Sequence, residues 1–360
     1  MRFIHTADLR LNAAGHAALP PEKEKKRAQE LTECLKNMIE GAEAEQVSGI
    51  LMLGELFDRD RMFPHAKAVL FRLIREHPDL LFFCLPESEE ALRAMTADDP
   101  LPPNLKLFDA NWTQFRVENI LVSGIVVREE ELEALYESAV FPEDSINIVL
   151  LYCPDGEGGS RVEPARLKHK NIDYLAVGPS LSYHMESMDE RGIAAASGSP
   201  EGLDYAEEGP HGFVVLDVDP KEKRVSGHFI PFAKRGLYTV TVDIGGAEDT
   251  EEIINRIGEA MDARRIPETA LVRLVLTGTL DIESGKENDR ILDAFSPFCY
   301  HIELDDRTVF HVDRARYEND ASLRGEFVRQ VLADETLEEK ERITVLRMGL
   351  QAILKEEVTA

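Results

Sequence analysis

Five stretches, each an apolar run that ends at a polar turn, constrain the fold of this chain more than any other feature. The runs have the length of β-strands and are rich in Val, Ile, Leu and Phe, which is typical of strands buried in a sheet. Segments with helical periodicity lie between them. Alternation of strand and helix predicts an α/β sandwich with a mixed sheet. The five stretches are Met1–Leu11, Gly49–Asp60, Leu80–Glu90, Ile146–Gly156 and Ile172–Tyr183.

Apolar residues that recur every three or four positions predict three helices among these strands. The helices cover Pro20–Gln46, Pro64–His77 and Glu129–Ser138. The alternation within Trp112–Val127 predicts a β-hairpin that turns near Asn119. The Pro-rich segment Ala97–Leu107 is expected to be a loop.

The charge balance limits the partners of this chain. Of its 360 residues, 68 are Asp or Glu and 41 are Lys or Arg, which gives a formal net charge of −27. Because a DNA-binding surface neutralises phosphates with Lys and Arg, this excess of acid disfavours tight unaided DNA binding and suits work inside a complex. No apolar run approaches about 18 residues, so no membrane span is expected. Four scattered cysteines without a C-x-x-C pair indicate reduced thiols in a cytoplasmic protein.

The polar turns after the strands carry a degenerate set of motifs. In chain order they read Asp8-Leu9-Arg10, Gly54-Glu55-Leu56-Phe57-Asp58, Pro86-Glu87-Ser88-Glu89, Tyr152 and Gly178-Pro179-Ser180-Leu181. Their order resembles the SbcD family, the nuclease subunit of the bacterial SbcCD DNA-repair complex. That family belongs to the calcineurin-like metallophosphoesterases, where the same places read D-x-H, G-D-x-x-D, G-N-H-D, a strand ending in His, and G-H-x-H. The stretch Gly198–Asp219 also resembles the family.

The resemblance implies a domain organisation and a set of partners. It implies a metallophosphoesterase-type α/β/β/α sandwich over residues 1–232, a small α+β capping domain over 233–316 and a C-terminal helical pair over 317–360. Family members are metal-dependent exonucleases that act on DNA ends as homodimers with a coiled-coil ATPase of the SbcC type. The expected β-α-β-β order of the capping segment includes a turn at Asp305-Asp306.

Two-metal phosphodiester cleavage needs two cations about 4 Å apart, held by carboxylate, imidazole and amide ligands. By resemblance, Asp8 and Glu55 stand at ligand positions, although Glu55 is one methylene longer than the bridging aspartate of the family. Ser88 stands where the family has its proton-donating histidine, and a hydroxyl is no acid near neutral pH. A guanidinium at position 10 repels metal instead of binding it. The altered ligand positions are Arg10, Glu87, Tyr152, Pro179 and Leu181.

These substitutions predict an SbcD-like subunit that has lost its nuclease activity and needs no cofactor. One alternative stays open, an active phosphoesterase that uses Mn or Mg. Its single cation would be held by Asp8, Glu55, Glu87 and Glu89. A second alternative is an architectural protein with no role on DNA. No phosphate-binding G-x-x-x-x-G-K-[ST] motif or G-x-S-x-G motif offers another chemistry.

Three further expectations concern single features. Arg10 is expected to replace the lost metal charge through a salt bridge with Asp8 or Glu55. His5, within a strand, is expected to be a core histidine. Two amphipathic helices after Tyr317 are expected either to pack back as a pair or to present a surface to a partner.

Overall fold

The computed structural model describes residues 1–13, 15, 19–58, 63–97 and 100–359, which form two compact units. Unit 1 is Met1–Leu237 and unit 2 is Tyr238–Ala360. No helix in the described ranges combines the length and the apolar character that a membrane crossing requires. All four cysteines are buried and free of disulfide bonds.

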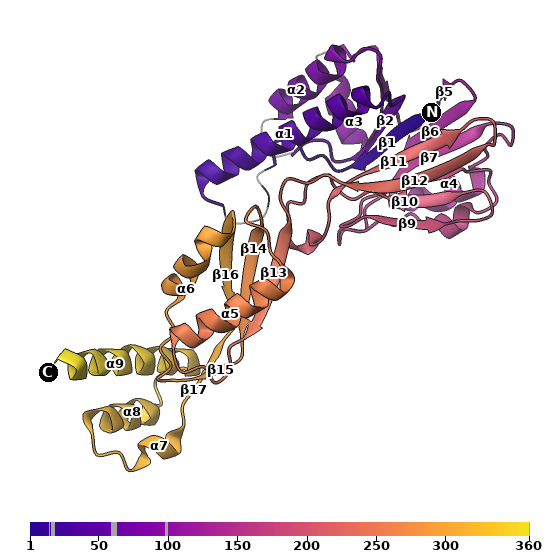
Figure 1. Ribbon diagram of the computed structural model, residues 1–360. Coiled ribbons are helices and arrows are strands. Elements are labelled where there is room, and N and C mark those ends of the chain that lie inside the picture. Colours follow the sequence, from indigo (N-terminus) through magenta and orange to yellow (C-terminus); the bar gives the residue numbers. More distant parts are fainter. Residues whose placement is uncertain (14, 16–18, 59–62, 98–99, 360) are drawn as a thin grey trace. The chain divides into compact units, whose positions relative to one another are not determined.

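The first sheet of unit 1 has six described strands in the order β12-β11-β1-β2-β3-β4 (Figure 1). Strands β1 to β4 run parallel, whereas β11 and β12 are antiparallel to their neighbours. Every residue of β2 is buried, as expected of a central strand covered on both faces. The strands are β1 (Arg2–Ala7), β2 (Gly49–Gly54), β3 (Leu81–Pro86), β4 (Leu105–Leu107), β11 (Gly212–Asp219) and β12 (Arg224–Pro231).

The second sheet of unit 1 has six described strands in the order β5-β6-β7-β8-β10-β9. Its inner strands are parallel and its two edge strands, β5 and β9, are antiparallel. The predicted hairpin is confirmed, because β5 and β6 pair around Glu118 and Asn119. The strands are β5 (Thr113–Val117), β6 (Ile120–Val126), β7 (Ile146–Tyr152), β8 (Tyr174–Gly178), β9 (His184–Ser187) and β10 (Ile193–Ala196).

The helices of unit 1 cover the outer faces of the two sheets (Figure 1). Side chains of α1, α2 and α3 share one hydrophobic cluster with the first sheet, and α4 packs on the second sheet. A separate cluster lies between the sheets. The layer order is therefore α/β/β/α, and the predicted fold class is confirmed. The helices are α1 (Pro21–Ala44), α2 (Phe63–Glu76), α3 (Glu89–Thr96) and α4 (Leu132–Ser138).

Unit 2 contains a three-stranded sheet, β13-β14-β16, and a two-stranded sheet, β15-β17. Helices α5 and α6 share the core of the larger sheet. The predicted turn at Asp305-Asp306 is wrong: β16 continues through Asp306, and β17 pairs in parallel with β15 instead of folding back on β16. The elements are β13 (Leu237–Asp243), α5 (Thr250–Arg264), β14 (Leu271–Thr277), β15 (Thr279–Asp281), α6 (Asn288–Phe295), β16 (His301–Asp306) and β17 (Val309–His311).

The helices after β17 pack back on unit 2. They are α7 (Arg314–Glu318), α8 (Leu323–Ala333) and α9 (Glu339–Thr359). Val328 of α8 and Leu346 of α9 share a buried cluster with Ile282 and Tyr317. The predicted pairing of the two long helices is therefore confirmed, since each covers part of the apolar face of the other.

Candidate functional site

Asp8 follows β1 directly and lies at the carboxyl ends of β1 and β2. Its backbone N–H donates to the Leu53 carbonyl at 2.9 Å, and its Oδ1 accepts a hydrogen bond from the Glu55 N–H at 2.9 Å. The residue is only 8% exposed. Its backbone is left-handed, with φ 49°, which is uncommon for a residue with a Cβ. Hydrogen bonds on both sides hold this conformation and fix the direction of the carboxylate.

Tyr152 reaches across from the second sheet and fills the space beside Asp8. It is the last residue of β7, and its hydroxyl donates to Asp8 Oδ1 at 2.8 Å. Its ring lies against two glycines: a Cβ added to Gly54 would stand 2.1 Å from the ring atom Cε2, and one added to Gly178 would stand 2.7 Å from Cδ2. No larger residue fits at either position while the ring is there. The tyrosine therefore occupies the centre of the predicted site.

Burial controls the protonation of this pair. Burial raises the pKa of Asp8 to about 6, and the Glu55 N–H, the Arg10 guanidinium and the Tyr152 hydroxyl oppose the rise without cancelling it. Burial holds the pKa of Tyr152 well above its ordinary value. The nearby carboxylates of Asp8, Glu55 and Glu87 raise this pKa further. The phenol is thus a neutral hydrogen-bond donor near neutral pH.

Arg10 forms an ion pair with Glu207, a partner that was not predicted from the sequence. Its Nη1 and Nη2 donate to the two carboxylate oxygens of Glu207, at 2.9 and 2.6 Å. The prediction that Arg10 pairs with Asp8 or Glu55 is wrong, although its charge acts on both carboxylates at longer range. Asp8 Oδ1 already accepts two hydrogen bonds, whereas Glu207 offers both of its oxygens to the guanidinium fork.

The family-like stretch Gly198–Asp219 supplies Glu207 and holds it in place. Glu207 ends a short 3-10 turn that begins at Tyr205. The Ser199 hydroxyl donates to the same carboxylate at 2.9 Å, and His211 packs behind it as a buried ring. The stretch therefore acts as a rigid support for Arg10.

The acidic positions do not all converge. Glu55 and Glu87 lie close enough to Tyr152 to raise its pKa. Glu89 is directed elsewhere: it opens α3 and pairs with Arg93 at 3.3 Å along that helix. The predicted four-carboxylate cluster is wrong for Glu89, because a residue in the first turn of a helix projects from the helix and not along the preceding strand.

Two of the altered positions, Ser88 and Leu181, have structural roles. Ser88 caps α3, because its Oγ accepts a hydrogen bond from the Ala91 N–H at 3.2 Å. Leu181 packs over Gly158, where an added Cβ would lie 2.7 Å from the leucine Cδ2. The peptide bond before Pro179 is cis. Neither the proline nor the leucine side chain has an atom that can ligate a metal.

Among the residues that the structure describes, no histidine replaces the missing ligands. His5 is a core histidine, as predicted: its Nδ1 lies 2.7 Å from the Tyr174 hydroxyl, and burial lowers its pKa to about 3. His211 is buried, whereas the side chains of His169 and His184 are 71% and 68% exposed. These rings belong to separate surroundings and form no common site.

The residues at the predicted site do not fit a pair of divalent cations. Asp8 Oδ1 is engaged by two hydrogen-bond donors, and the Tyr152 ring fills the adjacent space. The imidazoles that Mn and Fe favour are missing from the family positions. In the part of the chain that the structure describes, no three His, Cys, Asp or Glu side chains are arranged to hold a metal ion.

A second cluster of buried charges was also missed by sequence reasoning. Arg27 pairs with Glu201 at 2.8 Å, and Arg235 donates two hydrogen bonds to Glu30 at 2.7 and 2.6 Å. All four residues are buried, so two cations balance two anions away from water. The cluster ties α1 to the segments on either side of β11 and β12. It carries no free charge for a ligand.

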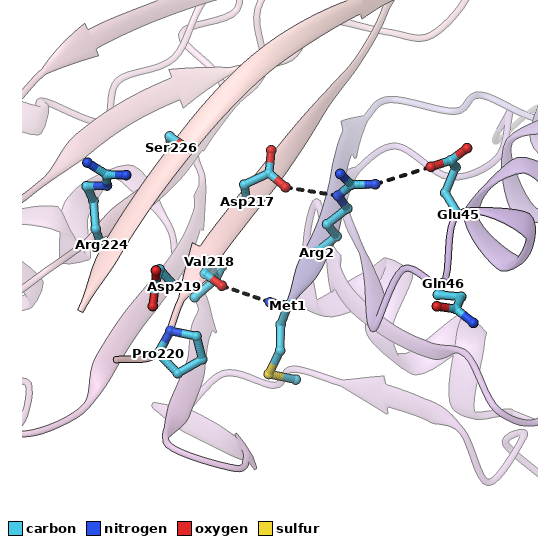
Figure 2. Close-up of a pocket in the computed structure, with 10 residues that line it drawn as sticks. All are labelled: Met1, Arg2, Glu45, Gln46, Asp217, Val218, Asp219, Pro220, Arg224 and Ser226. Atoms are coloured by element: carbon cyan, nitrogen blue, oxygen red, sulfur yellow. Dashed lines mark hydrogen bonds and ion pairs between the residues drawn. The ribbon is translucent and has the colours of Figure 1, made fainter. Parts of the chain in front are cut away.

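A pocket of about 610 Å³ opens at the other end of β1 from Asp8 (Figure 2). Arg2 is its central cation, and it pairs with Asp217 at 2.9 Å and Glu45 at 3.2 Å. The amino group of Met1 donates to the Val218 carbonyl at 2.8 Å. Because Arg2 is already neutralised by two carboxylates, it is not available as a phosphate ligand.

The chain is similar to several solved structures, at low identity. TT1561 of Thermus thermophilus shares 16% identity at a TM-score of 0.40, over 63% of this chain and 98% of that one. A dimetal phosphatase from Danio rerio shares 10% identity at a TM-score of 0.39, over 60% of this chain and 92% of the phosphatase chain. A purple acid phosphatase from yellow lupin, Lupinus luteus, shares 11% identity at a TM-score of 0.38, over 64% of this chain and 53% of the phosphatase chain. No known protein-family model and no curated protein matches the chain.

Proposed function

We propose that this chain is a non-catalytic, SbcD-like subunit of a DNA-repair nuclease and ATPase complex. The observation that carries the proposal is the position of Tyr152. Its hydroxyl binds Asp8, and its ring fills the glycine-lined space where the family would hold its cations. The α/β/β/α frame and the order of the strand-end motifs support the family assignment.

The chemistry of the remaining groups supports loss of catalysis. Asp8, Glu55 and Glu87 bring three carboxylates to the strand ends, and their negative charge disfavours the approach of a phosphodiester. Arg10, the nearest guanidinium in sequence, is committed to Glu207. Ser88 is committed to its helix cap and has no proton to give near neutral pH.

The proposed working state is a cytoplasmic homodimer bound to a coiled-coil ATPase of the SbcC type, with DNA contacted through the complex. The net charge of −27 supports a partner that supplies the basic surface. The helical pair of unit 2 is the proposed contact, because Leu323 on α8 is 71% exposed and Met348 on α9 is 69% exposed. Large apolar side chains that are exposed to solvent are typical of protein interfaces.

Activity is tested with the full chain on single- and double-stranded DNA, with Mn or Mg added and the metal content measured. We expect no turnover above background, and the same result for the Asp8→Asn variant. A Mn-dependent nuclease activity that disappears in Asp8→Asn would support the alternative of an active acidic metal site.

Partner binding is tested by co-expression with an SbcC-type ATPase and capture of the complex. We expect Leu323→Glu to weaken capture. Val140→Glu is the matched control, since Val140 is 81% exposed but lies in unit 1. Absence of any complex with the unaltered chain would favour an architectural protein without a DNA role.

A further inference from the structure

A groove of about 1340 Å³ lies within unit 2, between the segment that precedes α6, strand β17 and helix α9. Phe310 of β17 and Ile343 and Met348 of α9 give it apolar walls. The Met348 side chain stands largely in solvent, at 69% exposure. The groove combines these walls with charged groups that nothing described so far uses.

Arg347 is the cation of this groove for which the described residues provide no ion pair, since Lys286 and Arg290 are both paired. Its guanidinium carbon lies 3.7 Å from the centroid of the Phe310 ring. Its Nε is buried and makes no hydrogen bond. In the described ranges no carboxylate lies within ion-pair distance of it, although the chain holds 68 acidic residues. Burial lowers the pKa of Arg347, which is the direction expected of a cation without a close counter-ion.

The carboxylate that acts on Arg347 electrostatically is already saturated. Asp306 Oδ2 accepts from the Lys286 ammonium and from Asn288 Nδ2 at 3.2 Å. Its Oδ1 accepts from the Thr308 N–H at 3.2 Å and the Thr308 hydroxyl at 2.6 Å. A carboxylate has about four lone-pair sites, so Asp306 has none left for a guanidinium. The Nη groups of Arg347, which are not buried, are therefore available to an acceptor from outside the chain.

The charges around Arg347 select the kind of acceptor. Lys286 and Asp306 pair with each other, so no ion pair neutralises the charge of Arg347 among the described residues. The rim carries exposed carboxylates at Glu287 and Asp289. A monoanion suits that pattern better than a phosphate dianion, because the rim repels the second negative charge.

We propose that this groove binds a small monocarboxylate with an apolar body. The carboxylate accepts parallel hydrogen bonds from the guanidinium of Arg347, which is stacked on Phe310 and so held in a fixed plane. The apolar body lies along Ile343 and Met348. This site is separate from the Asp8 site, and it shares Met348 with the partner contact proposed above.

The test is a titration of the full chain with hexanoate, followed through the ¹³C-labelled methyl group of Met348, whose signal is assigned with Met348→Leu. We expect saturable shifts. Arg347→Gln should weaken binding about tenfold or more, and Arg347→Lys should weaken it less, because a lysine keeps the charge but loses the fork. The matched control is Arg290→Gln, a groove arginine that is already paired with Glu251 at 2.8 Å; its affinity should match that of the unaltered chain.

Three results would overturn the proposal. The first is no Met348 shift with hexanoate in the millimolar range. The second is an equal loss of affinity in Arg347→Gln and Arg290→Gln. The third is tighter binding of inorganic phosphate than of hexanoate, which would assign the groove to phosphate instead. The methionine methyl spectrum of each variant reports whether it is folded. If Arg347→Gln does not fold, Arg347→Lys still tests the proposal.

Discussion

Replacing Asp8 with Asn is expected to stabilise the folded chain at neutral pH. The pKa of Asp8 is about 6 in the folded state, against an ordinary value of 3.8, so the folded protein holds this proton more tightly than the unfolded chain. The stability that Asp8 contributes is therefore fully present below pH 3.8 and is lost as the pH rises through 6. A pKa difference of that size corresponds to about 3 kcal/mol at pH 7 and above.

Asparagine avoids this loss because it is neutral at every pH. Its Oδ1 can accept the same hydrogen bonds from the Tyr152 hydroxyl and the Glu55 N–H. The measurement is urea unfolding of both proteins from pH 4 to pH 8, followed by the fluorescence of Trp112, the single tryptophan, which lies in unit 1. We expect little difference at pH 4 and a gain of up to about 3 kcal/mol at pH 8.

Asp155→Asn is the control with the opposite sign. Backbone N–H groups of Glu157 and Gly159 lower the pKa of Asp155, so this carboxylate stabilises the fold at neutral pH and its replacement should destabilise it. The reasoning about Asp8 is refuted if Asp8→Asn gives no gain at pH 8, or gives the same gain at pH 4.

Two further predictions concern packing and buried charge. Arg10→Ala leaves the buried carboxylate of Glu207 without its counter-ion, and we expect a loss of about 3–5 kcal/mol in urea unfolding; a loss below about 1 kcal/mol would show that water replaces the guanidinium. Gly349→Ala places a Cβ 2.1 Å from the Phe327 ring at the crossing of α8 and α9, and should cost about 1–3 kcal/mol. The control Gly258→Ala, on α5 with open space around it, should be neutral or stabilising by up to about 1 kcal/mol, and equal effects at the two glycines would contradict the packing argument.

The sheet framework could be predicted because its central strands are short apolar runs. Strands β2 and β7 are buried over their whole length, and no other element gives that pattern between polar turns. Strand β9, with the sequence His184–Ser187, is mostly exposed and polar, so periodicity does not mark it. Strand β4 lies inside the segment Ala97–Leu107, which was predicted to be a loop. The strand was missed because three residues are too few to show a period.

The pairing of strands in unit 2 could not be predicted from the sequence. Strands β16 and β17 are neighbours in the chain, which favours a hairpin, but Asp306 continues β16 and β17 pairs with β15. The choice depends on the core shared by α5, α6 and the larger sheet, and on hydrogen bonds such as that from Lys286 to Asp306.

The sequence predicted that Asp8, Glu55 and Glu87 lie near one another, but it did not predict the contacts that Asp8 and Arg10 make. Strand ends of an α/β sheet meet at one edge, so the meeting of Asp8, Glu55 and Glu87 near Tyr152 follows from the strand order. The partner of Arg10 is 197 residues away in sequence, and nothing in the stretch around Glu207 marks this residue as that partner. Only the tertiary structure brings those two side chains together.

The fit of the Tyr152 ring against Gly54 and Gly178 limits the order in which a metal centre could be built at this site. The ring occupies the space beside Asp8, so an imidazole introduced at a neighbouring position alone gains nothing from metal. Removing the ring alone leaves an empty space lined by two glycines, and losing a buried aromatic ring costs about 3–5 kcal/mol. Stepwise construction of a metal centre therefore passes through a less stable protein, unless several substitutions are made together.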